Sequence, residues 1–336
     1  MDKLVKIIFS LAVLPLFWAC DNASLDGGDK SSLPSSSGKY GEVLIVVDTF
    51  YEKHQTGVVL DKIFSEAMVG MPQAEGHFRA STVPPKAFQS ILKRSRNILK
   101  LSIGQGKKTA FNIEEDVWAK DQLLIQIMAA SDTDAARILS KNVQTIRDYY
   151  NERELKRLKA QFKGKPQKEI MDFIQEQYNI NVVVPPGFLQ MAKNENGFWL
   201  KKEKSIGQHQ IMQGISFYVR PYSSDSVFSN EVMIEKRNEF AKEMIQGAPD
   251  SSFMAVYQDY LPITKEVNLN GVYALEYRGL WNMVNDFMGG PFLHYTMVDE
   301  KNNRVIELDA FVFAPKFDKR EYLRELEAIL KTVTVN

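Results

Sequence analysis

His294 is the residue whose neighbours in the sequence could best support acid–base chemistry. A histidine acts as a general base when a carboxylate orients its ring, and Asp286 and Asp299 flank it in the sequence. Two hypotheses follow. His294 is either the base of a hydrolase acting on glycan or peptide, or an ordinary histidine of a strand or loop. The first requires Asp286 or Asp299 within hydrogen-bond distance of His294, in an open cleft.

The segment 278–295 is also the strongest candidate for a binding surface. It is rich in arginine, methionine and aromatic residues, which recognition surfaces use when they stand in loops. Because the Gly-Gly-Pro run at 289–291 should interrupt a strand, we expect a connecting loop here. A second interpretation stays open, in which this loop folds back and closes the core. The candidate binding residues are Arg278, Trp281, Asp286, Phe287 and His294.

Three further patterns could carry chemistry, and each has a simpler interpretation. Residues 104–109 (GQGKKT) are similar to a phosphate loop, but Leu101 stands where the motif needs its first glycine and Lys108 where it needs Ser or Thr. We therefore predict a hairpin turn. The acidic residues 114–116 could bind a cation or form the first turn of a helix. The basic residues between Arg153 and Lys168 could contact anionic lipid headgroups or form the solvated end of a helix.

No established catalytic motif is found in the sequence. It contains no G-x-S-x-G, H-E-x-x-H or G-x-G-x-x-G pattern, and no two of the four histidines stand at i, i+4 spacing. The single cysteine excludes an intramolecular disulfide and any multi-cysteine metal site. We therefore predict no catalytic residues, no metal ligands and no cofactor.

The hydrophobic pattern predicts an α+β protein made of two α/β-type halves. In the first half, 40–180, apolar runs such as 42–47 are typical of strands buried on both faces, and helical patterns separate them. In the second half, 181–336, strands joined by short turns predict an antiparallel sheet backed by helices, similar to an α/β/α sandwich. Asp48 follows the first strand, where it could line a crevice at the sheet edge or cap the next element.

Composition narrows the class of protein further. Hydrophobic residues make up 44% and charged residues 25% of the 336 residues, which excludes a disordered chain and suits about two domains. The 42 Lys and Arg balance 42 Asp and Glu, so the net charge is zero. A nucleic-acid binder held by bulk electrostatics is thereby excluded, and we expect no nucleic acid among the partners.

The N-terminus has the layout of a secretory signal. Lys3 and Lys6 precede the apolar stretch 7–19, which is too short to span a membrane comfortably. Residues 1–19 are therefore predicted to be a signal peptide. The following residues to 39 are rich in serine and glycine, which predicts a flexible linker that joins residue 20 to the folded part.

Ala19 and Cys20, at the end of the apolar stretch, resemble the lipobox of bacterial lipoproteins. The resemblance implies cleavage before Cys20 and attachment of diacylglycerol to its thiol through a thioether, with palmitate as an expected acyl group. It further implies a location in the bacterial cell envelope, on the periplasmic side or the cell surface. The lipid bilayer, reached through acylated Cys20, is the first expected partner.

The second half resembles an uncharacterised family of Bacteroidota envelope lipoproteins. The matching runs are 278–283 (RGLWNM), 286–292 (DFMGGPF) and 311–315 (FVFAP). The family is a domain of unknown function, so the resemblance implies anchoring but no chemistry. The order of elements after Pro185 is also similar to PsbP/Mog1-like sandwiches. We predict a non-enzymatic binding or assembly module, with another envelope protein as its partner. An envelope hydrolase and a carrier of a small ligand or lipid are the alternatives.

Overall fold

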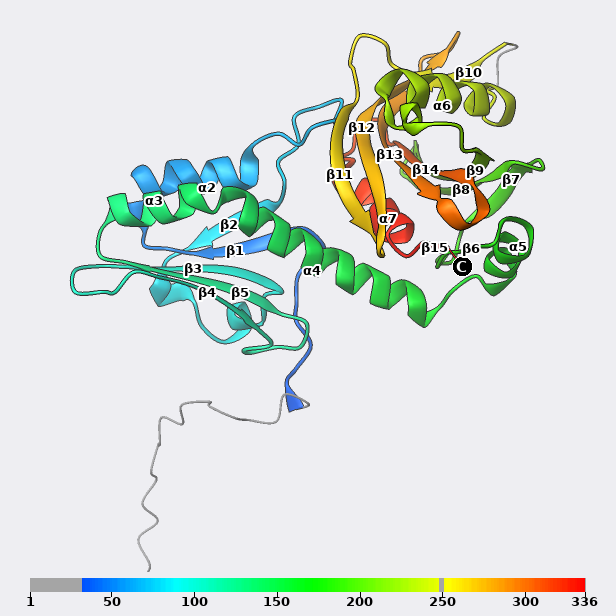
Figure 1. The fold of residues 1–336 in the computed structure, drawn as a ribbon. Helices are drawn as coiled ribbons and strands as arrows, with labels where there is room; N and C mark the ends of the chain where they lie inside the picture. The colour runs from blue at the N-terminus through cyan, green and yellow to red at the C-terminus, as the bar shows by residue number, and fades with distance from the viewer. Residues whose placement is uncertain (1–31, 248–250, 336) are drawn as a thin grey trace, which may run out of the picture.

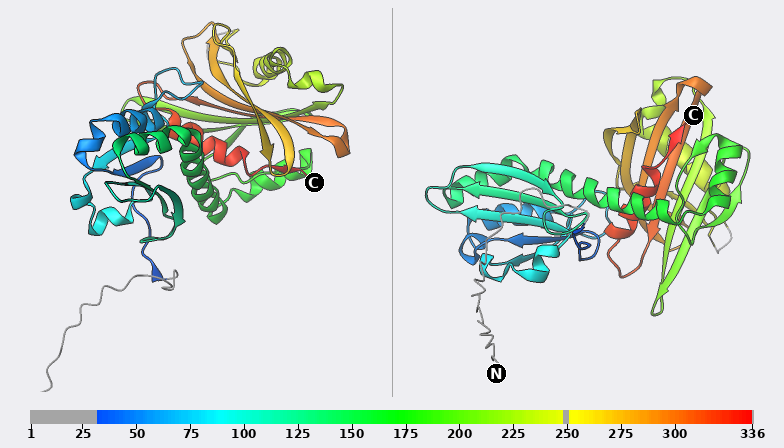
Figure 2. Two further views of the ribbon diagram at one scale, coloured as in Figure 1. Left: turned by 60° about the vertical axis from the view of Figure 1, so that its left-hand side comes forward. Right: turned by 90° about the horizontal axis from the view of Figure 1, so that it is seen from below.

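The computed structural model describes residues 32–247 and 251–335, which form two halves connected by a long helix (Figures 1 and 2). The expected α+β class is confirmed, since a mostly parallel sheet occupies one half and an antiparallel sheet the other. Cys20, the expected signal peptide and the first part of the expected linker lie outside the described residues. Among the described residues, no helix is both long and apolar enough to cross a membrane.

The N-terminal half is built on a 5-stranded sheet in the order β2-β1-β3-β5-β4, in which only β4 runs antiparallel to its neighbour (Figure 1). Helices cover one face and 3-10 segments the other, which explains the apolar runs of the central strands. The strands are β1 (Glu42–Val46), β2 (Arg79–Val83), β3 (Asn97–Ile103), β4 (Ala110–Glu115) and β5 (Leu123–Ala129). The helical elements are α1 (Thr49–Glu52), α2 (Gln55–Ser65), η2 (Pro85–Ala87), η3 (Ser90–Arg94), α3 (Asp132–Lys141) and α4 (Val143–Gly164).

Three local expectations in this half need correction. Residues 114 and 115 end strand β4 instead of starting a helix, and Asp116 follows with a φ of 57°. The turn at 104–109 is present, but β5 lies between β3 and β4, so the turn does not close a hairpin. Within the basic segment, Arg153 and Arg157 are buried and not solvated. The Arg157 guanidinium, for example, donates to Glu154 and to the Asp121 carbonyl.

The last residues of the expected linker lie against the N-terminal half. Ser35 forms a bridge with Lys120, and Ser37 forms one with Ser95. The Arg94 guanidinium also donates to the Ser35 carbonyl, at 3.2 Å. The chain is therefore attached to the fold from at least residue 35 onward.

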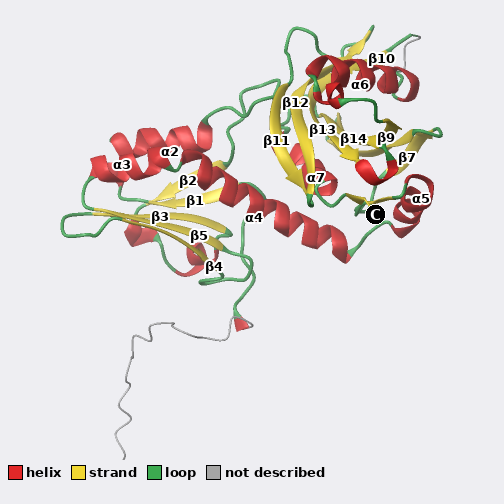
Figure 3. Ribbon diagram, viewed as in Figure 1, coloured by secondary structure: helices red, strands yellow, loops and turns green. Residues whose placement is uncertain are grey.

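The C-terminal half contains an 8-stranded sheet in the order β10-β12-β13-β14-β9-β8-β7, with β11 paired to β12 at one side (Figure 3). All pairs are antiparallel, as predicted. The strands of this sheet are β7 (Leu189–Lys193), β8 (Gly197–Ile206), β9 (His209–Pro221), β10 (Phe253–Val256), β11 (Ile263–Leu269), β12 (Val272–Val284), β13 (Gly289–Asp299) and β14 (Arg304–Phe313). A separate 2-stranded sheet pairs β6 (Ile180–Asn181) with β15 (Thr334–Val335). The helical elements are α5 (Lys168–Tyr178), η4 (Asp225–Phe228), α6 (Asn230–Met244), η5 (Glu300–Asn302) and α7 (Arg320–Leu330).

The two faces of this sheet have separate apolar cores. Leu323, Leu326 and Leu330 of α7 pack on one face against alternate residues of β14 such as Ile306. Met233 and Phe240 of α6 belong to the core on the other face, together with Phe311 and Trp281. Even-numbered residues of β14 from Ile306 to Val312 join the first core, and Phe311 and Phe313 join the second, as a sheet covered by helices on both faces requires.

The expected loop at 278–295 is a β-hairpin, so that prediction is wrong. The Gly-Gly-Pro run lies inside β13, where a Cβ on Gly290 would stand 1.9 Å from the Val312 carbonyl oxygen. Glycine is therefore needed for close packing and not for a turn. Pro291 fits because the ladder with β14 begins only at Phe292, so at Pro291 one side of the strand has no partner.

The halves are joined by packing and by hydrogen bonds. Helix α4 runs from the first half to the second and packs against α7 (Figure 2). The Glu75 carboxylate, from the loop after α2, accepts hydrogen bonds from the backbone N–H groups of Lys319 and Arg320 at 2.8–2.9 Å. It thereby caps the N-terminus of α7, a helix that belongs to the other half.

Candidate functional site

A cleft of about 720 Å³ lies between the two halves. Cavities at such interfaces are favoured places for ligands, because two separate surfaces converge there. Four segments line it: the loop after α2, the first turns of α4, the strands β11 and β12, and α7. The lining residues are Glu66, Ala67, Met68, Val69, His77, Phe78, Gln144, Arg147, Asp148, Asn151, Glu152, Ile263, Thr264, Lys265, Val267, Glu276, Arg278, Arg324, Glu327 and Lys331.

A network of ion pairs forms one end of the cleft. The Arg278 guanidinium donates to Glu276 at 2.7 Å and to Glu327 at 2.9 Å. Lys331 lies 3.1 Å from the second oxygen of Glu327, and the Tyr295 hydroxyl donates to Glu276 at 2.9 Å. Burial opposes ionisation of Glu327, but Arg278 and Lys331 outweigh it and lower the pKa of the carboxyl. The charges therefore neutralise one another inside the protein and are not free for catalysis.

The remaining arginines of the cleft are held in the same way. The Arg147 guanidinium donates to the Ile63 carbonyl at 2.8 Å and pairs with Glu66. Arg324 donates to Asn151 of α4 and to the carbonyl of His77, so it connects the two halves. Burial, followed by the nearby positive charge of Arg147, lowers the pKa of His77 to about 4. The His77 imidazole is thus neutral at pH 7 and available as a hydrogen-bonding group.

Strand β11 presents its unpaired edge to the cleft. Among the described residues it pairs with β12 alone, and Figure 1 shows it on the side of the sheet nearest the N-terminal half. Ile263, Thr264 and Lys265 all line the cleft, although successive side chains of a strand point to opposite faces. A cavity lined by all three must reach the edge of the strand, where backbone N–H and C=O groups are open to a partner.

The predicted binding residues do not form one surface. Arg278 lies at the cleft, whereas the Trp281 side chain is 1% exposed and packs against Phe311. Asp286 and Phe287 lie at the tip of the β12–β13 hairpin, where Phe287 is fully exposed. Of the two interpretations of 278–295, core packing holds for Trp281 and His294, and surface exposure holds for Phe287.

His294 belongs to a buried polar network and not to an open site. Its two ring nitrogens lie 2.9 Å from Glu307 and 3.2 Å from Asp309, and Arg237 pairs with Asp309 at 2.7 Å. Burial opposes the charge on the imidazole, but hydrogen bonds to Asp309 and Glu307 prevail and raise its pKa. In spite of burial, the hydrogen bond to His294 lowers the pKa of Glu307, and the charge of Arg237, followed by the hydrogen bond to His294, lowers the pKa of Asp309.

The acid–base pairing predicted for a hydrolase is therefore wrong. Asp299 pairs with Arg304 at 2.8 Å, and the carboxylate of Asp286 accepts from the backbone N–H of Phe287. Neither is bonded to His294, which has no exposed surface. Among the described residues, no group of three or more His, Cys, Asp or Glu could hold a metal ion.

Asp48 has both of the roles considered for it. Its carboxylate accepts from the Phe50 N–H at 2.9 Å and so caps α1. It also lines a hollow of about 420 Å³ together with Ser102 and Lys107, whose side chains are hydrogen bonded to each other. The hollow lies at the carboxyl ends of β1 and β3, the edge where open α/β sheets commonly bind ligands.

Sequence reasoning missed most of the cleft. Glu276 stands in β12, whereas Arg324 and Glu327 stand in α7, and their partners in other segments become visible only in the fold. The sequence did contain one signal of this network, because Glu327 and Lys331 stand at i, i+4 spacing. That spacing indicates an ion pair but not a cleft.

Comparisons with known proteins identify domains whose functions are unknown. Residues 167–332 match the family model of a domain of unknown function, DUF4837, and residues 36–163 match that of another, DUF8532. No curated protein matches the chain. The boundaries that we placed at 40, 180 and 181 stay a prediction.

Among solved structures, the chain is similar to a mutant of the protein Mog1 and to the Saccharomyces cerevisiae Ran-binding protein Mog1p. Each is 12% identical, with 47% of this chain and 90% of the other chain covered and a TM-score of 0.30. The expected resemblance to Mog1-like proteins is thus found as a weak structural similarity. At this TM-score it carries no argument about function.

Proposed function

We propose that this protein is a non-enzymatic binding module of the bacterial envelope, tethered through acylated Cys20, and that the cleft between its halves binds an extended polypeptide segment. The observation that carries the proposal is the open edge of β11 inside the cleft. An extended chain can pair with such an edge through backbone hydrogen bonds, while pockets beside it select side chains.

The character of the cleft supports binding over catalysis. Arg147, Arg278 and Arg324 all hold partners within the protein, so they shape and rigidify the cleft. Met68, Val69 and Ile263 add apolar surface, and the last two are almost half exposed. A carrier of lipid would require a continuous apolar cavity, which this charged lining does not match.

Filling the cleft tests the proposed binding site. An Ile263→Trp substitution puts an indole into the cleft, because Ile263 stands opposite Arg278 and shares its face of the sheet. Ile206→Trp, at the similarly exposed end of β8, is the matched control. Affinity capture of the full chain from crosslinked envelopes should recover a polypeptide in stoichiometric amount with the wild type and the control, and at least tenfold less with Ile263→Trp. Equal recovery with all three proteins would exclude the cleft as the binding site.

The proposed anchor has its own test. Wild-type protein should partition into the detergent phase of Triton X-114 and carry the mass of a diacylglycerol adduct on a chain that begins at Cys20. A Cys20→Ala variant should remain in the aqueous phase, without the adduct. Detergent partitioning of the variant, or an unmodified wild-type cysteine, would contradict lipid anchoring and leave the cleft proposal intact.

A further inference from the structure

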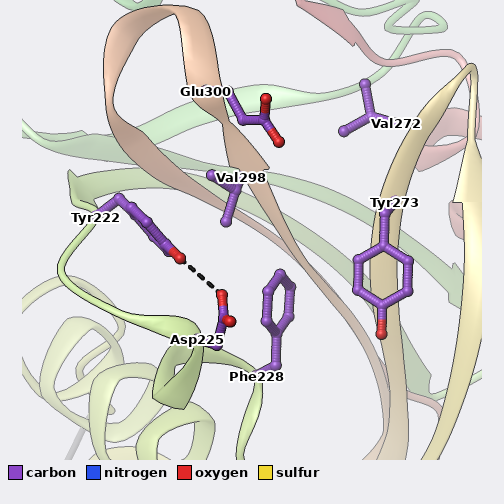
Figure 4. A pocket seen from close by; sticks show the side chains of 7 residues that line it. All are labelled: Tyr222, Asp225, Phe228, Val272, Tyr273, Val298 and Glu300. Carbon is purple, nitrogen blue, oxygen red and sulfur yellow. Dashed lines mark hydrogen bonds between the residues drawn. The ribbon is translucent and has the colours of Figure 1, made fainter.

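A second cavity, of about 670 Å³, lies on the C-terminal half, where η4 faces one end of strands β12 and β13 (Figure 4). Three aromatic residues, two valines and two carboxylates line it, and no lysine or arginine does. We call it the aromatic cavity. Its lining residues are Tyr222, Asp225, Phe228, Val272, Tyr273, Val298 and Glu300.

Two aromatic rings stand beside each other in this cavity. The centroids of Phe228 and Tyr273 are 5.4 Å apart and the ring planes meet at 82°, so one ring presents its face and the other its edge. Tyr273 stands within strand β12, and its side chain is half exposed to solvent. The exposed π-face of such a ring carries partial negative charge and attracts cations.

The two carboxylates of the cavity have no cationic partner among residues 32–247 and 251–335. Asp225 accepts a hydrogen bond from the Tyr222 hydroxyl at 2.7 Å, and neither Asp225 nor Glu300 makes an ion pair with a described residue. The arginine near this end of the sheet is engaged elsewhere, because Arg304 pairs with Asp299. The hydrogen bond to Asp225 raises the pKa of Tyr222, so that its hydroxyl stays protonated. The cavity therefore holds two carboxylate groups that no described lysine or arginine pairs with.

The lining of the aromatic cavity is fixed before any ligand enters. The Tyr277 hydroxyl donates to the Phe228 carbonyl at 2.7 Å and attaches η4 to the sheet. The Tyr222 N–H donates to the Asn303 carbonyl at 3.2 Å, which attaches the other side to the turn after η5. A preformed site loses less conformational entropy on binding than a flexible one.

We propose that the aromatic cavity binds an organic ammonium group. The aromatic faces attract the cation and its alkyl carbons, and Asp225 and Glu300 neutralise its charge. This site is separate from the cleft, with which it shares no lining residue. The ammonium group could belong to a free amine or to the headgroup of a lipid, and these two sources share the chemistry that the cavity recognises.

Titration of the full chain with choline tests the proposal directly. The protein is kept in maltoside detergent, and binding is followed by the upfield ring-current shift of the choline methyl protons and by calorimetry. The neutral isostere 3,3-dimethyl-1-butanol has the same shape without the charge, so its Kd should be at least tenfold weaker. Choline that fails to saturate the protein, or an isostere that binds as tightly, would overturn the proposal.

Variants separate the aromatic cavity from other surfaces. Tyr273→Leu should weaken choline binding at least fivefold, and Asp225→Asn combined with Glu300→Gln should weaken it at least tenfold. Tyr149→Leu, which removes a comparably exposed tyrosine from α4, should leave the Kd unchanged. Equal effects of Tyr149→Leu and Tyr273→Leu would contradict the assignment, and near-ultraviolet circular dichroism verifies that each variant is folded.

Two further ligands distinguish the sources of the ammonium group. Butylammonium represents a free amine, and phosphocholine adds the phosphate of a headgroup. If the phosphate lies beside the carboxylates, phosphocholine should bind at least fivefold more weakly than choline, which assigns the site to free amines. Equal binding of phosphocholine and choline places the phosphate outside the cavity and assigns the site to headgroups.

Discussion

Replacing Trp281 with alanine should destabilise the C-terminal half strongly. Replacing Phe287, at the tip of the β12–β13 hairpin, with alanine should not. The Trp281 side chain is 1% exposed and packs between Phe311 and Phe313. A buried tryptophan removes roughly 200 Å² from water, worth about 5 kcal/mol at about 25 cal/mol per Å². Large aromatic-to-alanine changes in cores cost about 3–5 kcal/mol, which agrees.

The loss of a hydrogen bond adds to this cost. The indole N–H of Trp281 donates to the Val312 carbonyl at 3.3 Å, and the carbonyl would be left without that donor, at a cost of about 1 kcal/mol. Phe287 is fully exposed and packs against nothing that a truncation would uncover. Its replacement by alanine should change the free energy of unfolding by less than about 0.5 kcal/mol.

Urea denaturation followed by far-ultraviolet circular dichroism measures both effects. With a slope of about 2 kcal/mol per M, a loss of about 5 kcal/mol lowers the midpoint by about 2.5 M for Trp281→Ala. Phe287→Ala should unfold with the wild-type midpoint. A Trp281→Ala protein within about 1 kcal/mol of the wild type would refute the reasoning, as would a Phe287→Ala protein that is destabilised to the same extent.

Two predictions concern the buried charges. The pKa of His294 is raised above its ordinary 6.5, so its contribution to stability is fully present below pH 6.5 and is lost as the pH rises through the folded-state pKa. The difference in unfolding free energy between wild type and His294→Gln should therefore shrink from pH 6 to pH 9 in urea titrations, and a constant difference would contradict the assignment. Glu327→Gln leaves Arg278 incompletely paired in the cleft and should cost about 3 kcal/mol, whereas the exposed control Glu235→Gln should leave the free energy of unfolding close to that of the wild type. Equal costs in thermal and urea unfolding would show that the Arg278 network does not stabilise the fold.

Local patterns predicted those parts of the fold that depend on nearby residues. The apolar run at 42–47 gave β1 because a strand covered on both faces needs apolar residues at every position. The part of the β12–β13 ladder near the hairpin tip was missed because Gly290 is required by a distant contact, that with the Val312 carbonyl. Strand β4 was missed because it lies at the sheet edge, where the burial pattern is weak.

The candidate site was harder to predict than the fold. Arg278 was predicted to lie in a connecting loop, yet it lies within strand β12, at the cleft. Its two carboxylate partners come from β12 and α7. Burial of Arg153 and Arg157 likewise depends on acceptors from other segments, such as the Asp121 carbonyl. A single sequence shows which side chains carry charge, but pairing between residues 32 to 49 positions apart appears only when the chain has folded.

Photo-crosslinking from the edge of β11 tests the proposed binding function most directly. A benzophenone amino acid is placed at Ile263 in the cleft, or at Ile206 as the control, in full-length protein anchored in intact cells. The account predicts a single polypeptide adduct from position 263, whose crosslinked residues form one extended segment, and no such adduct from position 206. Adducts of equal yield from both positions, or none from position 263, would contradict a polypeptide-binding cleft.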